Sequence, residues 1–149
     1  MEYTTIEDPA ALARESLRQT ALQKEELAYQ AECQYDEGQL LIDATTGADQ
    51  LDNLRLSAAA KRKEADAYAK AADVSEDEIR DVRRGFLKRW INSLESSHIA
   101  HSAILKVKRD LEEPTADYDS ILDTLDKGHG VATKRLSEID KAKRAPVKK

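Results

Sequence analysis

One stretch of the sequence, Val74–Glu113, limits the possible folds more than any other. It opens with Ser75-Glu-Asp-Glu78. This is a capping box, in which the Ser75 hydroxyl accepts a hydrogen bond from the amide of Glu78 and the Glu78 carboxylate accepts one from the amide of Ser75. Pro114 follows it, and the residue before a proline is driven away from helical geometry. We therefore expect one helix over residues 75–113, roughly 55–60 Å long.

One face of this expected helix is apolar over most of its length. It carries Ile79, Val82, Phe86, Trp90, Ile104 and Leu111. So long a face cannot be buried within its own helix, so other segments or other chains must cover it. Aromatic anchors dominate interface energetics, and the face holds the only Phe and the only Trp of the chain. The candidate interface residues are Phe86, Trp90, Leu94, Ile79 and Val82. The alternative is that these side chains pack only within the chain.

The composition favours helices in the rest of the chain as well. The 149 residues include only five Gly and three Pro, and 36% are charged, which is typical of long helices. No alternating run of β-branched and aromatic residues predicts a strand. The expected fold class is all-α: an elongated antiparallel helical hairpin or bundle with coiled-coil character and three to five helices.

The helix boundaries follow from local signals, and they predict a single helical domain over residues 1–149. The expected helices cover residues 8–37, 48–72, 75–113, 115–127 and 131–143, and a short basic tail follows at 144–149. Asp8 and Pro9 are a favourable N-cap and first helical residue. Gly38 is expected to end the first helix. The helix could instead continue through it, since glycine costs only about 1 kcal/mol there.

Two closely spaced glycines interrupt an apolar heptad pattern in the last third of the chain. Tyr118, Leu122, Leu125, Ala132, Leu136 and Ile139 keep a heptad spacing, and His129 falls on the same seam. Gly128 and Gly130 flank this histidine. Two glycines within three residues favour a turn or hinge between two short helices. The alternative is a weak point inside one helix.

The sequence gives several indications of where the protein resides. Cys33 is the only cysteine, so an intrachain disulfide is impossible. The first residues lack the basic region and apolar run of a signal peptide, and no apolar run approaches the ~18 residues of a membrane span. We expect a soluble cytoplasmic protein, or one assembled there into a particle.

Charge is unevenly distributed along the chain. Residues 1–53 hold twelve acidic and three basic residues, whereas residues 134–149 hold seven basic and two acidic ones. Phosphate contacts need only basic side chains, although no aromatic residues alternate with them as in a base-stacking surface. The candidate polyanion-binding residues are Lys141, Lys143, Arg144, Lys148 and Lys149. Nucleic-acid binding through this tail is the alternative function, and pairing of acidic head with basic tail between copies is a further hypothesis.

Little in the sequence indicates catalysis or a metal site. Glu95, His98 and His101 could share part of a helix face, but a di-iron bundle requires a second Glu-x-x-His and further glutamates. Zinc requires three or four ligands. The chain has no phosphate-binding glycine loop, nucleophile elbow or zinc-protease motif. We expect no metal, no cofactor and no enzymatic activity, and a metal-dependent helical-bundle enzyme is the weakest hypothesis.

These observations favour one function over the others. The chain is expected to be a non-enzymatic structural or adaptor protein that presents long helix faces to protein partners. It would form a homo-oligomer or join a multi-subunit assembly, such as a virion or a secretion particle.

Overall fold

The structure is a computed structural model, and it describes residues 8–144. In this range the chain forms four α-helices and no strand. They are α1 (Pro9–Leu41), α2 (Ala48–Ala72), α3 (Glu76–Asp110) and α4 (Ala116–Arg144). The prediction of an all-α helical bundle with three to five helices is confirmed.

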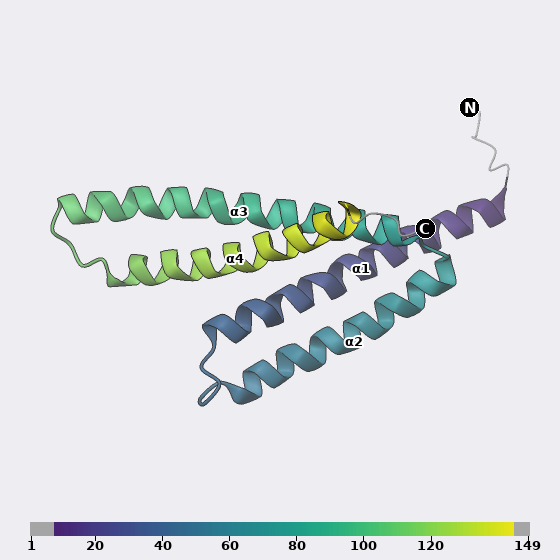
Figure 1. Cartoon of the computed structure of the whole chain (residues 1–149), viewed down its shortest axis with the longest axis horizontal. Helices are drawn as coiled ribbons and strands as arrows, with labels where there is room; N and C mark the ends of the chain where they lie inside the picture. Colours follow the sequence, from purple (N-terminus) through teal and green to yellow (C-terminus); the bar gives the residue numbers. More distant parts are fainter. Residues whose placement is uncertain (1–7, 145–149) are drawn as a thin grey trace, which may run out of the picture.

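The four helices are arranged as two antiparallel hairpins, α1–α2 and α3–α4, joined by residues 73–75 (Figure 1). Helix α1 lies between α2 and the second hairpin and packs against all three other helices. Over residues 8–144, α2 has no close backbone contact with α3 or α4. The α3–α4 hairpin extends well past the C-terminal end of α1 (Figure 1), so part of it has no third helix beside it.

The predicted capping box is present at the start of α3. The Ser75 hydroxyl accepts from the Glu78 amide at 3.2 Å, and Glu78 Oε2 accepts from the Ser75 amide at 3.3 Å. At the other end, Glu112 has a left-handed backbone with φ of 55°. The amides of Glu112 and Glu113 donate to the carbonyls of Arg109 and Lys108 at 3.1 and 2.9 Å. This Schellman motif ends α3 at Asp110, three residues before the expected end.

The predicted end of the first helix at residue 37 is wrong, because α1 continues through Gly38 to Leu41. Gly38 is buried where α1 meets α2. A Cβ at this position would lie 2.8 Å from Leu54 Cδ1 and 3.6 Å from Leu51 Cδ2. The glycine therefore permits close approach of two helices, and it does not end a helix.

The predicted break at Gly128–Gly130 is also wrong. Helix α4 runs without interruption from Ala116 to Arg144, in place of the two expected helices 115–127 and 131–143. Gly128 is buried beside the Glu37 side chain of α1 and Leu94 of α3. The heptad seam packs along α3 on both sides of the glycines. This packing outweighs a helix penalty of about 1 kcal/mol for each glycine.

The core is small and centred on α1. Tyr29 and Cys33 of α1, Leu87 of α3 and Ala132 of α4 form a buried cluster. The partly buried residues packed against it are Phe86, Trp90, Ile91, Leu136 and Ile139. The contact between α1 and α2 instead depends on small side chains, including the buried residues Ala21, Ala28, Ala31, Ala58 and Ala65. Helix α1 thus contacts α2 through alanines and the second hairpin through aromatic residues.

Replacing Gly130 with alanine should stabilise the protein by about 0.5–1 kcal/mol. Alanine has a higher helix propensity than glycine, and a Cβ at this position would have no neighbouring side chain within 4 Å. Urea unfolding followed by circular dichroism measures this. Gly38→Ala is the matched control, and it should not stabilise, because its Cβ would crowd Leu54. Destabilisation by Gly130→Ala would indicate that residues 128–130 form a turn.

Candidate interaction surface

The apolar face of α3 is covered by α1 in its first half and uncovered in its second half. The dividing level is Leu94, because a side chain at Gly128 would meet both Leu94 of α3 and Glu37 near the end of α1. Beyond this level the α3–α4 hairpin continues alone (Figure 1). The two halves therefore have different surroundings, although they belong to one continuous helix.

The predicted interface residues lie in the covered half and at the dividing level. Ile79, Val82, Phe86, Trp90 and Leu94 are all partly buried. The Phe86 ring meets the Tyr29 ring edge-on, with centroids 6.1 Å apart, and Trp90 lies 6.0 Å from Phe86. Phe86 therefore joins α3 to α1 within the chain, and Trp90 packs against the same core cluster. A role for any of the five residues at an intermolecular interface stays a prediction.

The uncovered half carries large apolar side chains that face solvent. We call Ile104, Val107 and Leu111 the distal seam. Their exposed fractions are 42%, 56% and 63%, whereas Leu105, in the same two turns, is only 5% exposed. Ile99 is also exposed, but it lies on a different side of the helix from Ile104. Ile104, Val107 and Leu111 are three and four residues apart, the spacing of a helix–helix contact. The sequence analysis identified Ile104 and Leu111 as part of an apolar face. It could not show that they are exposed, because that depends on where α1 ends.

Glu25 of α1 is buried, with 1% of its surface exposed, and it links both hairpins. Arg62 of α2 donates to both of its carboxylate oxygens at 2.7 and 3.0 Å, and Arg83 Nε of α3 donates to Oε2 at 3.0 Å. Burial alone would raise the pKa of Glu25. The hydrogen bonds from Arg62 and Arg83, together with their positive charges, outweigh burial and hold this pKa below its usual value.

Other arginines reinforce the contact between the hairpins. The guanidinium groups of Arg83 and Arg135 lie 5.3 and 5.1 Å from the centre of the Tyr29 ring, at cation–π distance. Arg135 also binds Asp36 of α1, with Nη2 2.6 Å from Oδ2. Arg89 pairs with Glu26 of α1. The basic residues of α3 thus neutralise carboxylates of α1, which sequence reasoning did not anticipate.

The basic tail lies mostly outside the described residues. Lys141 is exposed near the end of α4. The side chains of Lys143 and Arg144 are not described, and Lys148 and Lys149 lie beyond residue 144. Polyanion binding by this tail therefore stays a prediction.

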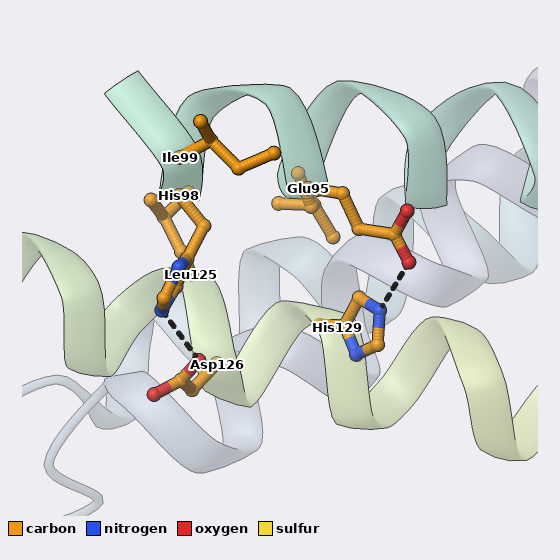
Figure 2. A pocket seen from close by; sticks show the side chains of 7 residues that line it. Glu95, His98, Ile99, Leu125, Asp126 and His129 are labelled. Carbon is orange, nitrogen blue, oxygen red and sulfur yellow. Dashed lines mark hydrogen bonds and ion pairs between the residues drawn. The ribbon is translucent and has the colours of Figure 1, made fainter. Parts of the chain in front are cut away.

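A groove of about 330 Å³ lies between α3 and α4 on the uncovered half. It is lined by Leu94, Glu95, His98, Ile99, Leu125, Asp126 and His129. Figure 2 shows two pairs that cross between the helices. Glu95 Oε1 lies 3.0 Å from His129 Nε2, and His98 Nε2 lies 3.3 Å from Asp126 Oδ1. These contacts tie the two helices together where α1 no longer reaches.

Glu95, His98 and His101 do not converge on a common point. Glu95 and His98 contact different residues of α4, and His101 Nδ1 lies 2.7 Å from the Ser97 carbonyl oxygen. Within residues 8–144, no three His, Cys, Asp or Glu side chains are grouped so that they could hold a metal ion. Cys33 is buried in the core, where desolvation raises the pKa of its thiol to about 12. This environment suits packing and keeps the thiol protonated.

Comparison with protein-family models, curated proteins and solved structures finds no match to this chain. Among the described residues, no helix has the length and apolar character needed to cross a membrane.

Replacing Glu25 with glutamine should lower the free energy of unfolding by about 2–3 kcal/mol, because it removes the buried negative charge that Arg62 and Arg83 share. Arg62 keeps its pair with Glu32 at 2.6 Å, so Arg83 is the residue that loses its carboxylate partner. Chemical denaturation measures the change. Glu26→Gln is the matched control, since Glu26 also pairs with an arginine of α3 but its side chain is 39% exposed. It should change stability by at most about 1 kcal/mol. Equal effects would contradict a special role for Glu25.

The Glu25 contribution should also depend on pH. Because the folded state lowers its pKa, this contribution is complete above the unfolded value of about 4.5 and is lost as the pH falls through the lower folded value. The difference in unfolding free energy between wild type and Glu25→Gln should therefore be constant from about pH 6 to 8 and shrink below about pH 4.5. Burial raises the pKa of Glu37, but this group is common to both proteins and cancels. A difference that persists unchanged down to about pH 2 would contradict the assignment.

Proposed function

We propose that this chain is a non-enzymatic structural or adaptor protein. It assembles through a helix face of α3 with copies of itself or with other subunits of a larger complex. The observation that supports this proposal is the distal seam: three large apolar side chains, between 42% and 63% exposed, on one side of a helix.

The distal seam leaves apolar surface in contact with water. Burial of apolar surface is favourable by roughly 25 cal/mol per Å², and contiguous apolar patches on a protein surface mark interaction sites. The seam follows the same side of α3 on which Phe86 meets α1. A helix from another subunit that docks on the distal seam would occupy, farther along α3, a place equivalent to that of α1.

The spacing of the seam indicates the form of this partner. Ile104, Val107 and Leu111 recur at intervals of three and four residues, which suits knobs-into-holes packing against one further helix. Coiled-coil packing of this kind is part of the proposal. A subunit that works in this way fits a multi-subunit particle, for example a virion or a secretion assembly.

Replacing Val107 with lysine should weaken self-association at least about tenfold, because a charged group would have to be desolvated in the new contact. Sedimentation equilibrium over a range of concentrations measures the dissociation constant. Leu56→Lys on α2 is the matched control, since Leu56 is 54% exposed and Val107 is 56% exposed. It should leave association unchanged.

Two results would contradict self-assembly through the seam. One is a wild-type chain that remains monomeric at every concentration tested. The other is an equal loss of association in Val107→Lys and Leu56→Lys. Thermal unfolding of both variants controls for stability, and we expect small changes because both side chains already face solvent.

A further inference from the structure

We propose that two copies of this chain exchange their α1–α2 hairpins, so that the α1–α2 hairpin of each copy packs on the α3–α4 hairpin of the other. The occupant of the covered half of α3 is then α1 of a second copy. This exchange uses the contact between the two hairpins and leaves the distal seam free, so it can hold whether or not the seam binds a partner.

The connection between the hairpins is short. It consists of residues 73–75, and Asp73 has a left-handed backbone with φ of 53° and ψ of 46°. The amides of Asp73 and Val74 donate to the carbonyls of Lys70 and Ala69 at 3.3 and 3.0 Å, which closes α2. Aspartate adopts this conformation more readily than most other residues, but less readily than glycine. A short hinge that holds such a residue favours exchange, because opening it relieves the unfavourable backbone geometry.

Within residues 8–144, this hinge is the covalent link between the hairpins, and α1 makes all the direct helix packing between them. Helix α2 has no close backbone contact with α3 or α4 in the described range. Glu25 connects Arg62 of α2 with Arg83 of α3 through its own side chain. If α1 and α2 move together, the contacts inside their hairpin are kept. Every contact that α1 loses on one copy is regained on the other copy.

The surface between the hairpins is partly polar. Besides the aromatic core it contains ion pairs between α1 and the second hairpin, including Arg18–Glu78 at 3.0 Å, Glu26–Arg89 and Asp36–Arg135. Surfaces between domains of one chain that carry many polar groups resemble those of transient complexes, and they permit relative motion. The surface that is exposed while the hairpins separate is thus of the kind that two proteins use to find each other.

The Asp36–Arg135 pair provides a direct test, because α1 supplies one partner and α4 the other. In Asp36→Arg, the closed chain places two arginines against each other, and in Arg135→Asp it places two aspartates against each other. An exchanged dimer of one chain of each variant has a matched pair at both contacts, Asp with Arg in each case. Only exchange between copies restores complementarity in this mixture.

The two variants are purified separately, with a size tag on one, then mixed and followed by sedimentation and by mass measurement of the complex. We expect a dimer that contains one chain of each, with a dissociation constant at least about tenfold lower than that of either variant alone. Variants that remain separate after mixing would overturn the proposal. So would a mixed dimer no tighter than the two homodimers, because a contact through the distal seam is indifferent to these charges.

Two controls keep the result interpretable. The double variant Asp36→Arg with Arg135→Asp restores the pair inside one chain, and it should match the helix content and dimer fraction of the wild type. If either single variant loses its helix content, the experiment uses the more exposed pair Glu26–Arg89. Glu26→Arg is then mixed with Arg89→Glu, and the expected outcomes are the same. Asp73→Gly should lower the dimer fraction of the otherwise wild-type chain several-fold, since glycine adopts the left-handed hinge freely. An unchanged or higher dimer fraction would count against the proposal.

Discussion

The structure depends on one buried carboxylate. Among residues 8–144, Glu25 is the buried charged side chain, and its partners come from α2 and from α3. A buried charge is unfavourable unless it is paired. Arg62 and Arg83 must therefore both reach α1 at the level of Glu25. The requirement fixes the register of α2 and α3 against α1 at once. Alanine-rich contacts alone, as between α1 and α2, specify register poorly because small side chains interlock little.

Helix length is the second constraint, and it produces the candidate surface. Helix α1 ends at Leu41, about one turn beyond Glu37, which lies at the level of Leu94, whereas α3 continues to Asp110. The part of α3 beyond α1 packs against α4 but has no third helix on its apolar face. The crossed pairs Glu95–His129 and His98–Asp126 hold this part of α3 to α4. These polar contacts hold α3 against α4 and leave the distal seam exposed.

The sequence predicted what local chemistry determines. The capping box at Ser75, the range of α2 and the all-α class each follow from signals within a few residues or from composition. Gly38 and Gly128 were misjudged, because a buried glycine at a helix crossing looks the same in the sequence as a glycine that ends a helix. Glu25 could not be singled out among 29 acidic residues, since its burial depends on two arginines 37 and 58 positions away.

The sequence predicted which face of α3 is apolar, but not which part of that face is exposed. Phe86 and Leu111 lie on one apolar stripe in the sequence, and nothing local says that α1 covers the first and leaves the second in water. The basic residues that accompany the covered half are matched by carboxylates of α1, as in Arg89 with Glu26. Beside the distal seam, Lys108 and Glu113 flank Ile104 and Val107, and they already pair with each other at 3.2 Å. Apolar fit should therefore select a partner for the distal seam, whereas charge complementarity selects α1 for the covered half, whether α1 comes from the same copy or from another.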